Sequence, residues 1–338
     1  NKNGGCIIMT TYKALKGKKI KFLASDPPAA AGEGQVWYNG ADYKTSVKIE
    51  AWSAGGNLPA AGQSAAGFGT QTAAVSAGGT PPSAYGLKTF EYNGSSWTAG
   101  NNMARATGSP YTSAFGAGSG TLTAGWVTAG GYPTANNLVE HYDGTNWTAA
   151  AVLPATRGSG ISNGPQTAGL YFGGTTGSPP RTVQAGTFHY DGEAWTGGGD
   201  MNTARTNAGG SGVTGSQTAA LVFAGNVPAQ TNKTEEYDGT SWSEVTNFPR
   251  TASYLGFAGS QTDALAFSGY TSPGNAAVTT SGYDGTSWSS RPNMAAGRLF
   301  YKSNAGNAND ALAFSGEGLT NSTEEFSGVA TLKTITDS

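Results

Sequence analysis

The stretch Glu235-Glu236-Tyr237-Asp238-Gly239-Thr240-Ser241-Trp242 decides the fold, because near-copies of it recur along most of the chain. The other copies keep its Tyr, its turn and its Trp, and they occupy residues 90–97, 140–147, 188–195 and 281–288. Asp-Gly between two short apolar runs predicts a hairpin, since Gly takes positive φ freely and Asp or Asn tolerates it. Each copy is therefore expected to form a strand, a tight turn and a second strand.

The Trp residues of these copies, together with an earlier one, recur at a regular period. They are Trp52, Trp97, Trp147, Trp195, Trp242 and Trp288, with steps of 45, 50, 48, 47 and 46 residues. A repeat of about this length is typical of four-stranded propeller blades. We therefore expect an all-β protein, a six-bladed β-propeller, in which these Trp residues are equivalent. The aligned tyrosines are expected to be equivalent too, and they are Tyr92, Tyr142, Tyr190, Tyr237 and Tyr283.

Two further landmarks recur between the hairpins. A polar turn followed by small and apolar residues and a closing Gly is typical of a strand buried on both faces, as at residues 164–174, 215–225 and 259–269. An Arg that follows Met, Phe or Pro precedes most of these strands, at Arg105, Arg157, Arg205, Arg250 and Arg298. We interpret these residues as structural, bonding loop carbonyls between blades. The second interpretation is an anion-binding ring at one mouth of the propeller.

The order of these landmarks resembles the kelch repeat over roughly residues 48–328. The resemblance implies one blade per repeat, with the Arg-led strand nearest the central axis and the Trp strand outermost. This chain departs from the kelch pattern in two ways. Asp-Gly stands where kelch repeats usually have Asp-Pro, and Gly225, Gly269 and Gly316 stand alone in place of Gly-Gly.

The two ends of the repeat region suggest how the ring closes. Trp52 lies at the position of an outermost strand, but no Arg-led or Gly-Gly strand precedes it, and the last copy, residues 323–328, has no Trp. We therefore expect a composite sixth blade, completed by an N-terminal strand that contains Trp52, which leaves no open edge. A competing alignment makes residues 326–335 the outermost strand of that blade, and both strands can be present.

The residues before Trp52 give a second resemblance. Residues 35–40 and 46–52 have alternating apolar positions and are expected to form two strands around a longer turn. The first of them, Gln35-Val36-Trp37-Tyr38-Asn39, resembles a segment that precedes Gly-, Ser- and Thr-rich repeats in structural proteins of marine bacteriophages. The resemblance implies a virion protein that is made in the host cytoplasm.

Residues 1–34 carry no part of the repeat and are expected to form an N-terminal arm, with the propeller in residues 35–338. The first 22 residues hold six Lys and no acid, although the net charge of the chain is −2. One interpretation is a solvated tail. The other is a docking arm that meets an acidic surface of another virion protein or of a second copy. Its Lys residues would be Lys13, Lys16, Lys18, Lys19 and Lys21.

The sequence offers no catalytic, metal-binding or cofactor-binding constellation. His141 and His189 are the only histidines, and they occupy the same repeat position in successive copies. They are therefore expected to be exposed strand residues one blade apart and not joint ligands of a metal. The single Cys6 excludes an intramolecular disulfide and has no partner for nucleophilic chemistry. We expect no enzyme activity and no cofactor.

The remaining features narrow the function. No apolar run approaches a membrane span, no signal-peptide h-region is evident, and Lys residues without interleaved aromatics do not indicate specific nucleic-acid binding. We expect a non-enzymatic virion structural protein, a capsid decoration, fibre or tail appendage, that acts as a protein–protein or surface-binding module. Two alternatives stay open: a lectin-like adhesin that contacts host surface glycans through residues 175–184 and 270–277, and an enzyme that uses the central mouth.

Overall fold

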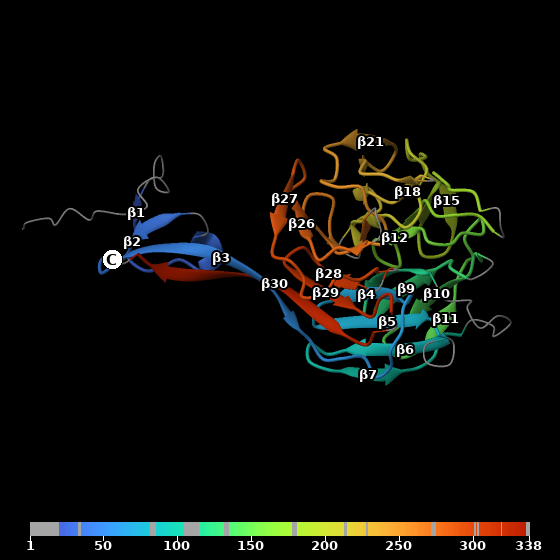
Figure 1. Ribbon diagram of the computed structural model, residues 1–338, viewed down its shortest axis with the longest axis horizontal. Helices are drawn as coiled ribbons and strands as arrows, with labels where there is room; N and C mark the ends of the chain where they lie inside the picture. Colours follow the sequence, from blue (N-terminus) through green and yellow to red (C-terminus); the bar gives the residue numbers. More distant parts are fainter. Residues whose placement is uncertain are drawn as a thin grey trace, which may run out of the picture. The chain divides into compact units, whose positions relative to one another are not determined.

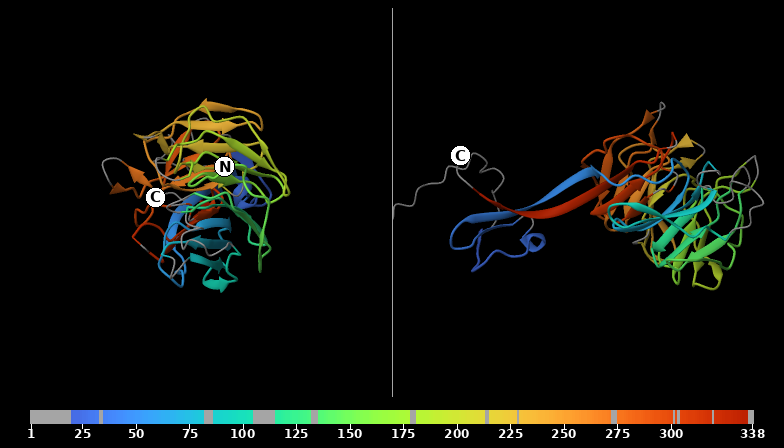
Figure 2. Two further views of the ribbon diagram at one scale, coloured as in Figure 1. Left: turned by 90° about the vertical axis from the view of Figure 1, so that its right-hand side faces the viewer. Right: turned by 90° about the horizontal axis from the view of Figure 1, so that it is seen from below.

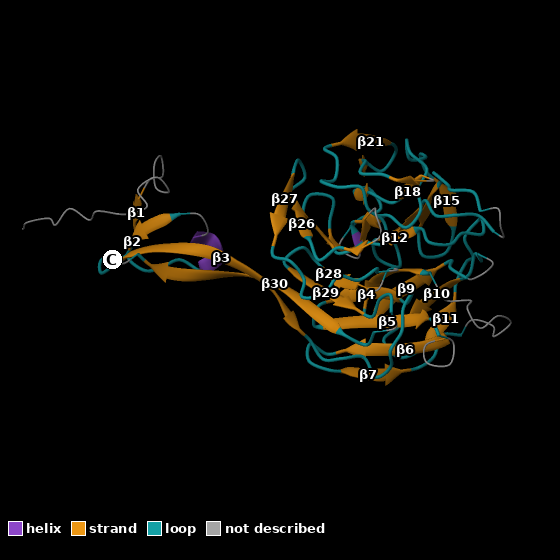
Figure 3. Cartoon of the chain, in the orientation of Figure 1, coloured by secondary structure: helices purple, strands orange, loops and turns teal. Residues whose placement is uncertain are grey.

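The structure is a computed structural model in which almost all of the regular secondary structure is β-strand, joined by turns and loops (Figures 1 and 3). It describes residues 20–32, 35–81, 86–104, 115–131, 135–177, 181–212, 215–227, 229–271, 275–300, 302, 304–318 and 320–335. One short 3-10 helix, η1 (Ala29–Gly32), is the only named helix in these ranges. No helix of the described residues is long and apolar enough to cross a bilayer.

Five four-stranded antiparallel sheets, numbered here as blades one to five, each come from one continuous stretch of chain. Blade one contains β4 (Ala66–Thr70), β5 (Ala73–Gly79), β6 (Gly86–Tyr92) and β7 (Trp97–Gly100). Blade two contains β8 (Ala117–Thr121), β9 (Ala124–Thr128), β10 (Val139–Tyr142) and β11 (Trp147–Ala149). Blade three contains β12 (Ile161–Asn163), β13 (Gly169–Phe172), β14 (Thr187–Tyr190) and β15 (Trp195–Gly197).

Blades four and five follow the same plan and add a small hairpin before the third strand. Blade four contains β16 (Gly209–Gly210), β17 (Ala220–Phe223), β20 (Thr234–Tyr237) and β21 (Trp242–Val245), with the hairpin β18 (Asn226–Val227) and β19 (Ala229–Gln230). Blade five contains β22 (Gly256–Gly259), β23 (Ala264–Phe267), β26 (Thr280–Tyr283) and β27 (Trp288–Arg291), with the hairpin β24 (Tyr270–Thr271) and β25 (Asn275–Ala276).

The sixth blade is composite, as predicted. Its strand order is β28 (Asn304–Gly306), β29 (Asp310–Phe314), β30 (Thr323–Thr334) and β3 (Tyr43–Ala54), so that its outermost strand comes from the start of the chain. The innermost strands β4, β8, β12, β16, β22 and β28 contact one another in this order, and β28 contacts β4. The contacts therefore close a ring of six blades, which confirms the predicted β-propeller.

The competing alignment of residues 326–335 is wrong. These residues continue β30 without a turn, and they pair with β3 instead of forming a further outer strand (Figure 2). Gly55 N–H donates to Thr323 O (3.0 Å), and Ile335 N–H donates to Tyr43 O (2.8 Å). A strand must turn to fold back beside itself, and β30 runs from Thr323 to Thr334 without interruption.

The chain divides into two compact units at a different place from residue 34. One unit is the propeller, Trp52–Phe326, and the other comprises Asn1–Ala51 with Ser327–Ser338. In the small unit β1 (Ile20–Phe22) pairs in parallel with β2 (Val36–Tyr38), which pairs antiparallel with β3. The Trp37 indole there is buried and donates to Asp26 Oδ1 (2.9 Å). The chain end joins this unit because β30 stays paired with β3 beyond the propeller.

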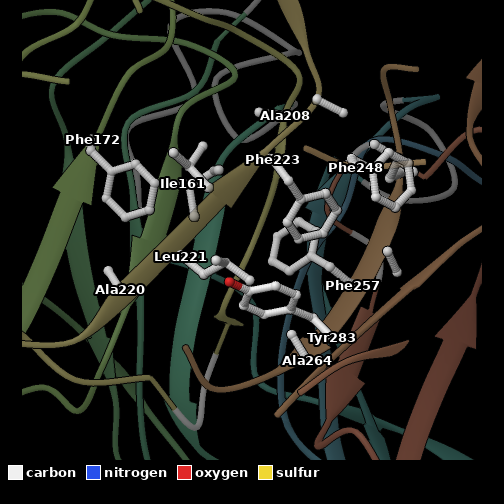
Figure 4. Close-up of a cluster of buried hydrophobic side chains, with 14 of the residues drawn as sticks. Ile161, Phe172, Ala208, Ala220, Leu221, Phe223, Phe248, Phe257, Ala264 and Tyr283 are labelled. Atoms are coloured by element: carbon white, nitrogen blue, oxygen red, sulfur yellow. The ribbon is translucent and has the colours of Figure 1, made fainter. Parts of the chain in front are cut away.

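The core lies mainly between neighbouring blades. In its largest cluster, Leu221 and Phe223 of β17 pack with Phe257 and Tyr283 of blade five (Figure 4). The second strand of each blade is buried on both faces, which is the pattern that the runs at residues 164–174, 215–225 and 259–269 predict. Burial of one such Leu or Phe side chain contributes about 1.5–3 kcal/mol.

The Asp-Gly turns form as predicted in position but not in detail. In the turn after Tyr237, only Gly239 has positive φ (+96°). Asp238 instead accepts hydrogen bonds through Oδ1 from the backbone N–H groups of Thr240 and Ser241, both at 2.8 Å. The Asp therefore works as the acceptor of an Asx turn, which Asn also provides in the copy at residues 90–97.

The backbone conformation after the second strand of each blade explains why some repeats have a single Gly in place of Gly-Gly. The first residue of the pair has φ of +57° at Ala224 and Ser268, which L-residues adopt at a cost of about 1 kcal/mol. The second residue is always Gly: at Gly225, φ is +95° and a Cβ atom would lie 2.8 Å from Thr206 O. Only the second position of the pair therefore requires glycine.

Candidate functional site

The six repeat Trp residues lie at the seams, which we define as the contacts between neighbouring blades. Trp52 Nε1 donates to Thr280 Oγ1 of blade five (3.0 Å), and its ring packs against Phe267 and Phe326. Trp97, Trp147 and Trp242 also donate to a Thr of the preceding blade, whereas Trp195 and Trp288 donate to the carbonyls of Ala151 and Thr246. Trp52 thus occupies the same place in the ring as the other five.

The repeat Tyr residues join the same seams through their hydroxyl groups. Each bonds the side chain just before the Tyr position of the preceding blade, which is Phe326 in blade six. The pairs are Tyr92 to Glu325, Tyr142 to Glu91, Tyr190 to His141, Tyr237 to His189 and Tyr283 to Glu236. Burial, together with the bond to Glu325, raises the pKa of Tyr92 to about 12, so this hydroxyl stays protonated and donates. These pairs have a structural role in closing the ring.

The sequence predicted that the two histidines are exposed strand residues, and the structure shows that they are not. His141 and His189 are half-buried, and burial lowers the pKa of both. The His189 Nε2 atom lies 2.7 Å from the Tyr237 hydroxyl oxygen, and His141 Nε2 lies 3.1 Å from that of Tyr190. The sequence missed this because the Tyr partner of each His is a whole repeat away.

A Gln in the turn between the first two strands also bridges seams. Gln261 Nε2 donates to Ala220 O (3.2 Å) and Tyr237 O (2.9 Å) of blade four. Gln71, Gln166 and Gln217 make the equivalent pairs of bonds to their preceding blades. The polar turn that opens residues 164–174, 215–225 and 259–269 therefore joins neighbouring blades through its Gln side chain.

The repeat Arg residues that the structure describes point into their own blades. Arg205 forms a buried ion pair with Glu235, and Arg298 pairs with Glu324 (2.6 Å). Both also donate to backbone carbonyls of the blade that they open, so these bonds lie within blades and not between them. Arg250 donates to Ser268 O (2.9 Å), and Arg157 lies over the Phe188 ring at 5.8 Å. Arg105 lies outside the described residues.

The Lys residues of the predicted docking arm are not described. Lys13, Lys16, Lys18 and Lys19 lie outside the described residues, and Lys21 is in β1, where only the backbone is described. Within the described ranges, no group of three or more His, Cys, Asp or Glu residues could hold a metal ion.

The axis of the propeller is closed by a ring of residues that the sequence analysis missed. Two residues before each innermost strand, a non-glycine residue has φ between +53° and +82°: Ser64, Phe115, Ser159, Asn207, Tyr254 and Lys302. From Phe115 to Tyr254, the N–H group of each member donates to the carbonyl of the member before it, for example Tyr254 N–H to Asn207 O (2.9 Å). We call this set the axial ring. Its side chains share no chemistry, so no sequence motif reveals it.

Below the axial ring, the innermost strands leave almost no space. The cavity on the axis has a volume of about 10 Å³, which is about what one water molecule needs. Lys302 and Asn304 are among its lining residues, and Lys302 also lines the mouth above it with Phe115 and Tyr254. This cavity, lined by described residues, is too small for a substrate-sized molecule.

A larger depression lies on the outside, at the seam between blades two and three. Its volume is about 410 Å³, and it is lined by His141, Gln166, Thr167, Asp191, Gly192 and Glu193. Asp191 Oδ1 already accepts the N–H groups of Glu193 (2.9 Å) and Ala194 (2.7 Å). The depression is polar and open, with no aromatic ring among its lining residues except the His141 imidazole.

Comparison with known proteins supports the fold. No protein-family model matches the chain, and no curated protein matches its sequence. Among solved structures, the chain is similar to YjhT, also a propeller, with a TM-score of 0.65 and 13% sequence identity. The similarity covers 82% of this chain and 99% of the YjhT chain. At this identity the likeness concerns architecture alone, and it places the chain among the six-bladed β-propellers.

Proposed function

We propose that this chain is a kelch-like, non-enzymatic structural protein of a bacteriophage particle, a decoration, fibre or tail appendage that binds other proteins or surfaces. The observation that carries the non-enzymatic part is the closed axis, where about 10 Å³ of space leaves no room for a substrate. The repeat Tyr, Trp and His side chains are also occupied in seam bonds. The virion assignment is supported by the segment Gln35–Asn39, which resembles bacteriophage structural proteins.

Attachment through the chain ends is part of this proposal. The small unit contains both termini, and the Lys-rich first 22 residues end with its first described strand, β1. Lys side chains that meet an acidic surface bind more weakly as salt screens their charge. We propose that this segment fixes the protein to another virion protein or to a second copy of itself.

Mass spectrometry of purified particles tests the virion assignment directly, since the chain must be present at a fixed copy number. For attachment, the sharper experiment replaces Lys13, Lys16, Lys18, Lys19 and Lys21 together by Gln, because this keeps β1 and the Asp26–Trp37 bond. Incorporation into particles or oligomers should fall while the melting temperature stays unchanged. Lys88→Gln, at an exposed site on β6, is the matched control. Unchanged incorporation of the fivefold variant would reject the arm as the attachment site.

A second candidate function, a lectin-like adhesin, is favoured by the polar depression of about 410 Å³ at the seam between blades two and three. Glu193 and Asp191 there are exposed and can accept hydrogen bonds from sugar hydroxyls. A glycan array with the full chain tests it. Binding that is lost in Glu193→Ala and kept in Glu244→Ala, an exposed acid of β21, would favour the lectin over the virion protein.

A further inference from the structure

Lys302, whose side chain is normally charged and exposed, is buried at the centre of the propeller. Only 6% of its surface is exposed, and it lies between the mouth and the axial cavity, lining both. Its Nζ atom crosses to blade four, where it donates to Ala208 O (2.8 Å), and it lies 5.2 Å from the centre of the Phe257 ring of blade five. The Lys302 side chain, which belongs to blade six, thus contacts blades four and five at the axis.

No carboxylate compensates this group. Every Asp and Glu of residues 52–326 lies in the described part of the chain, and none of them forms an ion pair with Lys302. Arg298, the nearest buried cation in sequence, shows the contrast, because it is paired with Glu324 at 2.6 Å. A buried ammonium without a paired anion is strongly disfavoured, and such a group loses its proton instead.

Among the described residues that line the cavity and the mouth, no side chain is negatively charged near pH 7. The cavity walls are mainly Gly and Ala of the innermost strands, with Ser162 and Asn304 as neutral polar residues. At the mouth, the facing side chains are those of Phe115, Ser159, Asn207, Tyr254 and Phe300. Tyr254 is the only titratable one, and burial raises its pKa, so it is neutral near pH 7. Burial lowers the pKa of Lys302 to about 7.

We propose that Lys302 is an uncharged amine above neutral pH that seals the propeller axis, and that the absence of this proton in the folded protein makes the stability of the ring depend on pH on the alkaline side of neutrality. The ordinary pKa of this side chain is 10.5, and the folded value lies below it, at about 7. The unfolded chain therefore binds a proton that the folded chain does not hold between these two values. Stability falls as the pH decreases from 10.5 to 7 and stays at the lower level below 7.

The experiment compares the full chain with Lys302→Met, which keeps the length of the side chain and removes the titrating group. Urea unfolding is measured from pH 6 to pH 9. Relative to the Met variant, the unfolded-to-folded ratio of the wild type should rise about 100-fold between pH 9 and pH 6, as linkage requires for these two pKa values. Lys88→Met, at an exposed site, should follow the wild type at every pH.

A second measurement does not depend on the folding of the variant. The ¹³Cε shift of Lys302 in the wild-type protein should titrate near pH 7. A Lys302 signal that titrates above pH 9.5, or equal pH dependence of the wild type and the Met variant, would overturn the proposal.

Discussion

The seam between blades four and five differs from the seam between blades five and six. The first has all three polar devices: Tyr283 bonds Glu236, Gln261 bonds two carbonyls, and Trp288 bonds the Thr246 carbonyl. The second keeps only the Trp device, through Trp52 and Thr280. We call it the closing seam, because Trp52 belongs to the N-terminal strand that completes the composite sixth blade. Its Tyr position is occupied by Phe326, and the acceptor position opposite by Gly282.

The closing seam lacks both the Tyr and the side chain that would accept its hydrogen bond. A Tyr hydroxyl at residue 326 would be buried without an acceptor, and an acid at residue 282 would lack its donor, so losing both costs little. The Gln position is Ala308, which packs in the apolar cluster of Phe267 and Phe326. The closing seam is therefore held by packing and by contacts near the axis, such as Asn304 Nδ2 to Phe257 O (2.6 Å).

The largest effect is expected when the strand that closes the ring is removed. Deletion of residues 46–52 takes away most of β3 and exposes the edge of β30, and an unpaired strand edge promotes association. We expect the variant to aggregate, which light scattering measures, and to lose cooperative melting, which calorimetry measures. Deletion of residues 1–19, which precede all described strands, should leave melting unchanged. A monomeric deletion mutant that melts like the wild type would refute composite closure.

Trp52→Ala tests the remaining device at the closing seam. Truncation of a fully buried aromatic such as Trp242 costs about 3–5 kcal/mol, and the cost for Trp52 should be at the lower end because this side chain is only partly buried. The seam of Trp242 also keeps the Tyr237 and Gln217 bonds. Hydrogen exchange should therefore show local opening of β27 and β3 in Trp52→Ala and no equivalent opening at β21 in Trp242→Ala. Equal local opening in the two variants would contradict the difference between the seams.

The Tyr–acceptor pair can be removed from one seam and built into the other. Tyr283→Phe should destabilise the protein by about 1.5 kcal/mol, because a hydrogen bond to a carboxylate is lost. Phe326→Tyr alone should cost about 1–3 kcal/mol, since its hydroxyl is buried opposite Gly282. Adding Gly282→Glu should recover part of this cost, because the nearest obstacle to a Cβ there is the flexible Arg291 side chain. Strict additivity of the two substitutions in urea unfolding would count against the pairing.

The smallest effect is expected for the Gln device. Gln261→Ala removes two bonds to backbone carbonyls of blade four and should cost about 1 kcal/mol. Gln184→Ala removes only bonds to the neighbouring Thr182 and Val183 carbonyls and should stay within about 0.5 kcal/mol of the wild type. If the two variants have the same urea midpoint, the turn Gln does not join blades.

Much of the fold was predictable because its signals are local and repeated. The spacing of Trp97, Trp147 and Trp242 gives the period, and Asp238-Gly239 marks the turn that separates two strands. The missing Trp after Phe326 and the unaccompanied Trp52 predicted a composite sixth blade, whereas only the structure decided that its outermost strand is β3. A repeat makes each of these signals reliable, since an error in one copy is corrected by the others.

What only the tertiary structure decided is which side chains meet across a repeat. The pairing of His189 with Tyr237, the inward direction of Arg205 and the continuation of β30 into the small unit depend on contacts far apart in sequence. The axial ring is the clearest case, because backbone geometry selects its positions while its side chains vary from Ser64 to Lys302. Sequence periodicity therefore determined the blades, whereas packing around the axis determined the environment of Lys302, where burial without a carboxylate sets the charge of its amine.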